Sequence, residues 1–222
     1  MVEFRADPRV EALQVRGRQH EAAYIQRLAA QGRTIHDLTD QRDPAATLAA
    51  MRAGHGAIVQ APLLGEGFFG IADVLLRCEA PSALGAWSYE PVDTKLSRET
   101  KATTVLQLAT YSDLLAAAQG IAPEHFHVVT PLAEETYRLA DFVAYFRFVR
   151  SRFRWASSVE PAPATYPDPV GHCDVCKYWK HCDDRRRADD HPWLIAGIRH
   201  AHVREFQAQA MPTLARSRAS GL

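Results

Sequence analysis

Hydrophobic and polar residues recur along the chain with two different periods, which divide it into helical and extended segments. Apolar residues at helical spacing predict a first helix over residues 8–30, ended by Gly32. Asp43 and Pro44, an N-cap residue followed by proline at the first helical position, predict a second helix that stops near residue 54. Further helices are predicted over residues 103–118 and about 140–155.

Between these helices the pattern changes to the shorter period of β-strands. Strands are predicted over residues 57–63, 68–78, 87–96, 126–131 and 136–139. The order is helices, a meander of three strands, a crossover helix and further extended chain. This order predicts an α/β fold, with a mixed central β-sheet flanked by helices.

The chain divides by composition into three parts. We expect residues 1–160 to form the core of one domain. Proline-rich sequence over residues 161–169 leads to a cysteine-rich segment that ends near residue 190 and closes this domain. Residues 191–222 read as a weakly helical tail. Because the chain starts in helix-like sequence and ends in such a tail, we expect it to be a piece of a longer protein.

The overall charge bears on how the protein could bind nucleic acid. The chain has 26 Lys and Arg and 26 Asp and Glu, so its net charge is zero. A protein of this kind that binds nucleic acid has to concentrate its positive charge locally. No apolar stretch of about 18 residues predicts a membrane span, and the N-terminus lacks the apolar core of a signal peptide. We therefore predict a cytoplasmic protein that does not bind a membrane.

Three polar residues interrupt two of the predicted strands. Asp73 lies in an otherwise apolar strand, and Asp93 and Lys95 lie in the next one. Strand side chains alternate, so Asp93 and Lys95 point to the same face, and pairing of the two strands would bring Asp73 beside Asp93. Two such carboxylates repel each other unless a divalent cation lies between them, and Mg²⁺ or Mn²⁺ prefers oxygen ligands of this kind. The pattern predicts metal-assisted phosphodiester hydrolysis, with Lys95 positioning the attacking water or neutralising the phosphate.

The same residues also have a simpler interpretation. An aspartate near a turn and an Asp-x-Lys pair on an exposed strand face occur by chance in many proteins. Spacing alone leaves both interpretations open.

The residues that follow add a resemblance to a known family. Asp73, then Asp93 and Lys95 about twenty residues later, then Gln107 and Tyr111 on the next helix, resemble the PD-(D/E)XK nuclease superfamily in its RecB-like form. Gln107 and Tyr111 are four residues apart and share one helical face, as the family's Q-x-x-x-Y motif requires. The resemblance implies a restriction-endonuclease-like fold, in which Asp73 and Asp93 bind Mg²⁺ or Mn²⁺ and Lys95 is catalytic. It implies a deoxyribonuclease that acts in DNA repair, recombination or processing of foreign DNA.

The first predicted helix contains a further candidate ligand. RecB-like nucleases often have a glycine followed by a histidine on this helix, and the resemblance implies that His20, three residues after Gly17, completes the metal site. The family spacing is closer to four residues, which leaves Glu21 as the alternative ligand.

Three of the four cysteines lie close together near the C-terminal end. Cys173, Cys176 and Cys182 form a C-x₂-C-x₅-C pattern. Such clustering favours a metal site over disulfides, and thiolates favour an iron–sulfur cluster or Zn²⁺. The spacing resembles the iron–sulfur nucleases of the same superfamily, which implies a [4Fe-4S] cluster that closes the nuclease domain.

The sequence does not identify a fourth ligand for such a cluster. In the iron–sulfur nucleases this ligand is a cysteine upstream of the nuclease motifs. Here no cysteine precedes the first helix, and we interpret Cys78 as a buried structural thiol. Either the ligand lies outside this chain, or His172 or His181 completes a zinc site with the three cysteines.

Arginines and aromatic residues interleave over residues 147–155, as a track for single-stranded DNA would require. The alternative, which we favour, is an amphipathic helix with Phe146, Val149 and Phe153 packed inward and its arginines in solvent. The arginines at 185–187 are a comparable candidate. DNA, with single strands favoured, is the predicted partner.

Two other functions remain open at this stage. One is a non-catalytic nucleic-acid-binding module on the same fold. The other is a zinc-stabilised interaction domain, in which the Asp-x-Lys pair at 93–95 is accidental.

Overall fold

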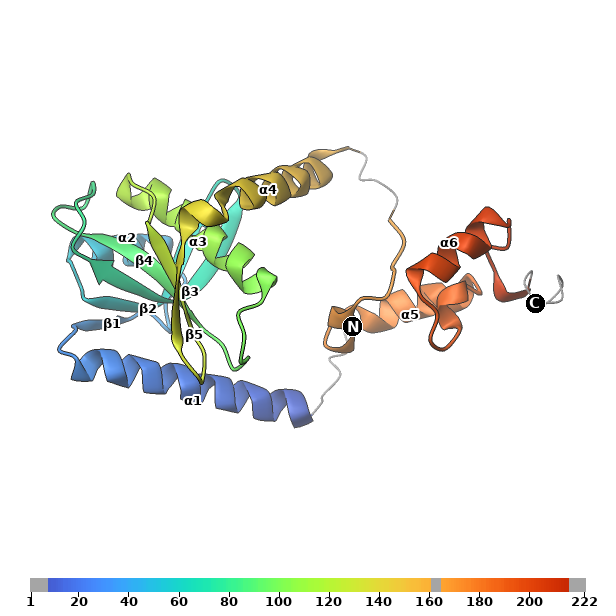
Figure 1. Cartoon of the computed structure of the whole chain (residues 1–222), viewed down its shortest axis with the longest axis horizontal. Coiled ribbons are helices and arrows are strands. Elements are labelled where there is room, and N and C mark those ends of the chain that lie inside the picture. The colour runs from blue at the N-terminus through green and yellow to red at the C-terminus, as the bar shows by residue number, and fades with distance from the viewer. Residues whose placement is uncertain (1–7, 161–164, 216–222) are drawn as a thin grey trace. The chain divides into compact units, whose positions relative to one another are not determined.

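The computed structural model describes residues 8–160 and 165–215. These residues form two compact units, 9–158 and the described residues that follow 158 (Figure 1). The boundary lies close to the predicted one at residue 160. The described residues 165–190 and 191–215 both belong to the second unit.

The first unit contains ten helices and strands and one short 3-10 helix among its described residues. In chain order they are α1 (Pro8–Ala30), β1 (Ile35–Asp37), α2 (Pro44–Arg52), β2 (Ala57–Gly65), β3 (Phe68–Cys78), β4 (Ser88–Thr94), α3 (Ala102–Gln119), β5 (His125–Val129), β6 (Glu134–Arg138), η1 (Leu139–Asp141) and α4 (Val143–Ser158). The predicted N-cap is confirmed, because Asp43 accepts a hydrogen bond from the Ala45 amide at the start of α2. Gly120 ends α3 in the left-handed region.

The six strands form one sheet in the order β1-β2-β3-β4-β5-β6. The pairs β1–β2 and β4–β5 are parallel, and the other three are antiparallel. This arrangement confirms the predicted α/β fold with a mixed sheet. The sequence did not predict β1, because a three-residue strand is too short to show an alternating pattern.

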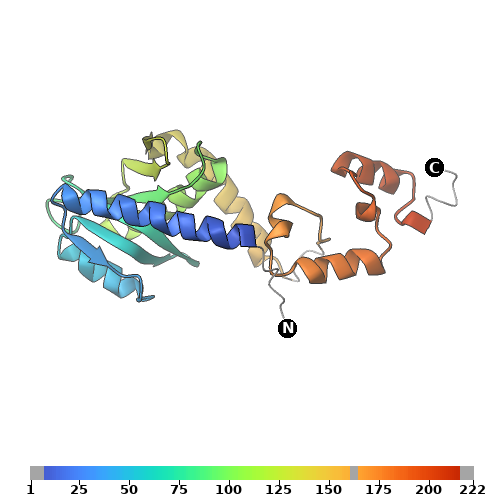
Figure 2. The same ribbon diagram turned by 90° about the horizontal axis from the view of Figure 1, so that it is seen from below.

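Helices cover both faces of the sheet (Figures 1 and 2). On one face, Tyr24 and Leu28 of α1 pack against a row of valines from four strands, namely Val59, Val74, Val92 and Val129. On the other face, α2 and α3 form the larger core with apolar residues of β2 to β5. Burial of these apolar side chains is the main source of the unit's stability.

The regular alternation of β2 is broken at Gln60. Its φ angle is 51°, in the left-handed region that a residue other than glycine seldom adopts. Ile58 and Ala61 belong to the same core although they are three positions apart, so the alternation shifts by one residue between them. Asp73 of β3 stands opposite Gln60, between the ladder pairs on either side. An irregular segment therefore lies next to the first of the predicted site residues.

The second unit contains short helices. They are η2 (Gly171–Asp174), α5 (Trp179–Ala188), η3 (Pro192–Leu194) and α6 (His200–Ala208). The buried Arg186 donates a 2.8 Å hydrogen bond to the Pro167 carbonyl, which fixes the end of the proline-rich segment to α5. The sequence did not predict α5, because this helix has no apolar stripe and is instead stabilised by ion pairs between residues four apart, such as Lys180–Asp184.

None of the helices in the described part of the chain combines the length and apolar character that a membrane span requires.

Candidate active site

The predicted carboxylates lie at the point where β3 and β4 separate. The last pair of this antiparallel ladder is Val74–Val92, and Asp73 and Asp93 follow it on the two strands. Instead of a ladder bond, the amide and hydroxyl of Thr94 donate to Asp73 Oδ2 at 2.9 and 3.1 Å. The structure thus brings Asp73 and Asp93 side by side, as expected from strand pairing.

The Asp93 side chain is fully buried, with an exposed fraction of 0%. Burial, followed by the negative charge of Asp73, raises its pKa to about 6, although Lys95 acts in the opposite direction. Lys95 Nζ donates a 2.9 Å hydrogen bond to Asp93 Oδ1. It also lies 2.8 Å from Oδ2, but Oδ2 is buried and accepts no hydrogen bond of suitable geometry from any described residue. The Lys95 ammonium therefore balances the charge of this buried oxygen, which still lacks a well-formed hydrogen bond.

Helix α3 supplies the next two predicted residues. Gln107 Nε2 donates to Asp93 Oδ1 at 3.3 Å and to the Tyr111 hydroxyl at 3.2 Å. Burial raises the pKa of Tyr111, which keeps its phenol protonated. The Gln-x-x-x-Tyr pattern therefore connects α3 directly to Asp93.

Gly70 of β3 lets the Tyr111 ring approach the sheet. A Cβ atom at this position would lie only 2.5 Å from Tyr111 Cε1. We predict that Gly70→Ala displaces the ring and lowers the free energy of unfolding by about 1–3 kcal/mol, measured by urea denaturation.

Gly17→Ala is the matched control for this substitution. Gly17 lies in α1 with no neighbouring atom within 4 Å of an added Cβ, so alanine there is expected to stabilise the helix by about 1 kcal/mol. Equal unfolding curves for Gly70→Ala and the unsubstituted chain would show that the Tyr111 ring can move aside without loss of stability, which would contradict the prediction.

Helix α1 contributes Glu21 to the same region. Its carboxylate accepts a 2.6 Å hydrogen bond from Gln60 Nε2, at the irregular point of β2. Burial raises the pKa of Glu21, Gln60 lowers it, and the nearby charge of Asp73 raises it further. Gln60, whose backbone is left-handed, thus holds Glu21 in the neighbourhood of Asp73.

His20, the predicted ligand on α1, has a different partner. Its Nε2 lies 3.0 Å from the Val129 carbonyl oxygen, an acceptor that also receives the Lys95 amide at 2.9 Å. Because a carbonyl only accepts, Nε2 must carry the proton. His20 therefore fastens α1 to the end of β5, whereas Glu21, the alternative ligand, is bound by Gln60 and is close enough to Asp73 for that charge to raise its pKa.

The carboxylates of Asp73 and Asp93 are ligands of the kind that a hard divalent cation prefers. No three His, Cys, Asp or Glu side chains in the described ranges are placed together as a complete metal site. Mg²⁺, however, is commonly held by one or two carboxylates and takes waters and phosphates as its other ligands. Asp73 and Asp93 are two adjacent carboxylates, and the unbonded Oδ2 of Asp93 is the atom that such a cation would satisfy.

The cysteine segment does not form such a site. Cys173 accepts a hydrogen bond from the Val170 amide at 3.3 Å, and Cys176 accepts one from the Tyr178 amide at 3.4 Å. Across 165–215, no third donor joins these sulfurs to make a metal-binding group, and Cys182 is also a free thiol. The predicted iron–sulfur or zinc site therefore rests on the cysteine spacing alone.

Cys78, predicted to be a buried structural thiol, is only partly buried. Cys78 Sγ lies 3.0 Å from the Ser88 hydroxyl oxygen, on the neighbouring strand. Burial raises the pKa of this thiol, which makes it a poor nucleophile.

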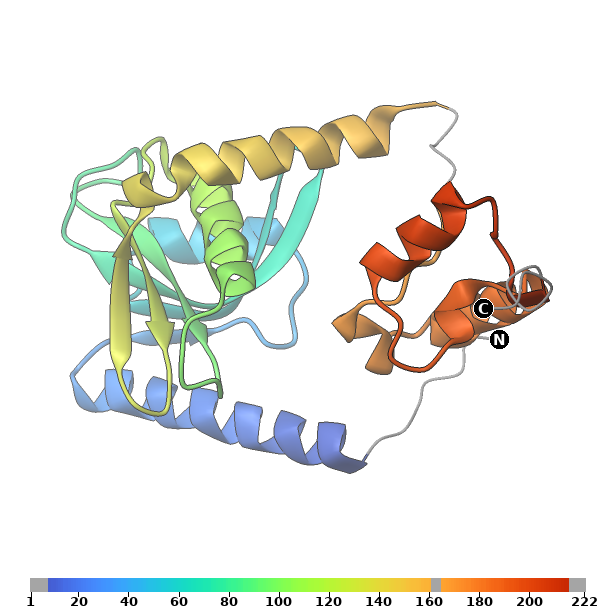
Figure 3. The same ribbon diagram turned by 45° about the vertical axis from the view of Figure 1, so that its right-hand side comes forward.

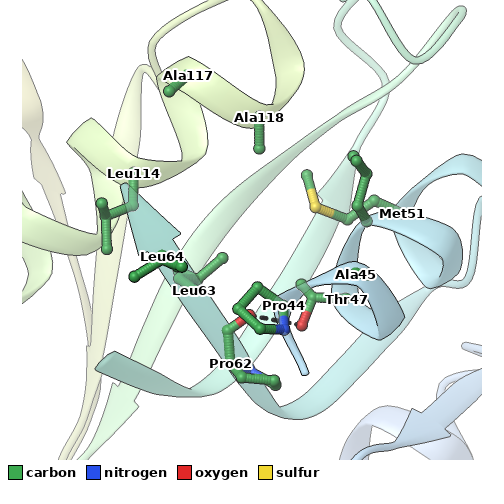
Figure 4. Close-up of a pocket in the computed structure, with 11 residues that line it drawn as sticks. Pro44, Ala45, Thr47, Met51, Pro62, Leu63, Leu64, Leu114, Ala117 and Ala118 are labelled. Atoms are coloured by element: carbon green, nitrogen blue, oxygen red, sulfur yellow. Dashed lines mark hydrogen bonds between the residues drawn. The ribbon is translucent and has the colours of Figure 1, made fainter. Parts of the chain in front are cut away.

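An apolar hollow of about 290 Å³ lies between α2 and α3, over β2 (Figure 4). Its only side-chain polar group is the Thr47 hydroxyl, which donates to the Pro62 carbonyl at 2.7 Å. The hollow contains no titratable side chain.

Comparison with known proteins adds no assignment, because the chain matches no protein family and no curated protein.

Proposed function

We propose that this protein is a Mg²⁺- or Mn²⁺-dependent nuclease that hydrolyses phosphodiester bonds of DNA. The observation that carries the proposal is the buried Asp93 carboxylate, which has an unbonded oxygen, lies beside Asp73 and contacts Lys95. Such an arrangement is unfavourable in a purely structural role, because like charges repel and buried charges lose hydration.

Each residue of the site has a distinct task in this proposal. Asp73 and Asp93 would hold the cation, which supplies Lewis acidity toward a bound water and the scissile phosphate. Lys95, one-third exposed, places its ammonium at the edge of the site, where it orients the attacking water or stabilises charge on the phosphate. Gln107 holds Asp93 in position, and Tyr111 in turn accepts from Gln107.

The resemblance to RecB-like nucleases supports DNA as the substrate. It also supports a role in DNA repair, recombination or processing of foreign DNA. The zero net charge agrees with a local rather than global contact to the phosphate backbone.

Cleavage of labelled DNA tests this proposal directly. The full chain is incubated with single- and double-stranded oligonucleotides in Mg²⁺, Mn²⁺ or EDTA, beside the Asp93→Ala variant. We expect cleavage that requires the cation and is lost in the variant. A folded chain that binds DNA but cuts it in none of these conditions would instead be a binding module.

Glu21 is expected to matter for the cation more than His20 does. We predict that Glu21→Gln weakens Mn²⁺ binding at least about tenfold, because its carboxylate lies close to Asp73. His20→Gln is expected to change Mn²⁺ affinity less than about threefold, because its ring binds a backbone carbonyl. Calorimetric titration with Mn²⁺ measures both, and the reverse order of effects would restore His20 as the ligand.

The iron–sulfur site at Cys173, Cys176 and Cys182 stays a prediction, as does its zinc alternative. Elemental analysis of the purified chain distinguishes an iron–sulfur site from a zinc site. Colour is a second test, because an iron–sulfur protein is brown and a zinc protein is colourless. A chain with neither metal would leave the three thiols free, as their arrangement in the second unit suggests.

A further inference from the structure

Helix α4 concentrates positive charge in a chain whose net charge is zero. Its sixteen residues include four arginines and no acidic residue. Arg150 pairs with Asp113 of α3, and Arg154 pairs with Glu66 in the β2–β3 turn. The two others, Arg147 and Arg152, form no ion pair with any residue in the described ranges, so their charge is available to a partner.

The same helix exposes large aromatic side chains. Phe146 is buried as predicted, but Phe153 is exposed, so its predicted inward packing is wrong. Tyr145, Phe148 and Trp155 are 60%, 56% and 64% exposed. Aromatic surface of this extent usually marks a binding surface rather than a solvated one.

These features align along one side of the helix. Tyr145, Phe148, Arg152 and Trp155 follow a 3-4-3 spacing, which places them in one row. The Arg152 guanidinium lies 5.6 Å from the centre of the Phe148 ring. Arg152 and Trp155 also line a shallow hollow with Ser151. The row from 145 to 155 is about 15 Å long, which matches about four stacked nucleotides.

We infer that this row, the α4 track, binds single-stranded nucleic acid. Arginines complement the phosphates, and exposed rings stack on unpaired bases, whereas a duplex hides the faces of its bases. Phe146, outside this row, packs in the core with residues of α3, the helix that carries Gln107 and Tyr111, and Tyr145 at the end of the row lines a small hollow beside α3 (Figure 3). The α4 track and the candidate active site therefore belong to one compact unit. The inference rests on the proposed function in taking the bound strand to be the substrate.

Binding without cleavage tests the α4 track independently of the nuclease proposal. Fluorescence anisotropy of labelled dT20 and of a 20-base-pair duplex is measured in EDTA, with the full chain, at several NaCl concentrations. We expect Trp155→Ala and Phe148→Ala each to weaken dT20 binding about tenfold. Arg152→Gln should reduce the slope of log affinity against log salt by about 0.7. Trp155→Phe should retain most of the affinity and lose the quenching of tryptophan fluorescence on binding.

Matched controls come from the same unit. Leu132→Ala removes an apolar side chain that is equally exposed in the turn after β5, and Arg52→Gln removes an exposed arginine on α2. Both are expected to leave dT20 affinity unchanged.

Several outcomes would overturn the inference. They are no binding of dT20 by the unsubstituted chain, equal weakening of duplex and dT20, or unchanged affinity with a lowered melting temperature in Trp155→Ala. The last result would identify the row as a packing surface for another part of the protein. Binding that depends on the α4 track, with no cleavage in Mg²⁺ or Mn²⁺, would reject the nuclease proposal and keep the track.

Discussion

Replacing Lys95 by alanine is expected to slow metal-dependent DNA cleavage by about a thousandfold while DNA affinity changes little. Its ammonium lies 2.8–2.9 Å from both oxygens of Asp93, at the partly exposed edge of the site. Removing one preorganised charge from such a site typically costs about 10²–10³ in rate. Single-turnover cleavage of a labelled oligonucleotide measures the rate, and anisotropy in EDTA measures the affinity.

Two further variants separate chemistry from charge. Lys101→Ala removes an exposed lysine just before α3, whose side chain makes no capping hydrogen bond, and should cleave at the normal rate. Lys95→Arg keeps the charge but replaces a compact ammonium by a planar, wider group, so its rate should stay low. Full activity of Lys95→Ala would remove Lys95 from the proposed mechanism.

Stability of the metal-free protein is expected to fall as pH rises from about 4 to about 6. The pKa of Asp93 is raised from 3.8 to about 6 by burial and by Asp73, so the folded state binds its proton more tightly than the unfolded state does. The folded chain therefore has to give up this proton at a cost as pH rises through that window. The loss amounts to about 3 kcal/mol and is complete above the folded pKa.

Asp93→Asn isolates this contribution from other titrating groups. Glu90 also titrates in this range. Burial raises its pKa, but hydrogen bonds from His127 and the His125 amide outweigh burial and lower it. Glu90 therefore makes the folded state more stable as pH rises, opposite to Asp93. Urea denaturation in EDTA should give similar stabilities for both proteins near pH 4. Above pH 6.5 the Asp93→Asn variant should be more stable by about 3 kcal/mol. Parallel curves over the whole range would contradict the raised pKa.

Added metal provides a second measurement on the same pair of proteins. Mg²⁺ or Mn²⁺ that binds the folded site should raise the stability of the unsubstituted chain at pH 7.5. The Asp93→Asn variant should gain much less. Without its cation at this pH, the unsubstituted chain should be less stable than the Asp93→Asn variant, although that variant should have lost its activity.

The sequence by itself determined most of the fold of the first unit. Residues 8–30 and 43–54 carry helical spacing or cap residues, and residues 57–96 contain apolar extended runs bounded by turn residues, so the local pattern predicts these elements directly. It also determined that Asp93 and Lys95 share a face, because strand alternation is a local property. Gln107 and Tyr111 share a helical face for the same reason.

Only the tertiary structure decided which groups meet across the fold. The break in alternation at Gln60 depends on its left-handed backbone, which no residue type signals, and this break brings Glu21 toward Asp73. His20 and Glu21 are adjacent in sequence, but helical geometry points them to different partners.

Burial and sulfur geometry were likewise decided by the tertiary structure. The burial of Asp93 Oδ2 arises from packing by elements distant in sequence, and Phe153 stays exposed although its ring lies 5.7 Å from that of Phe68 in β3. Spacing places Cys173, Cys176 and Cys182 close in sequence, but metal binding requires their sulfurs to converge in space. Sequence patterns report short-range geometry, whereas convergence of side chains depends on long-range packing.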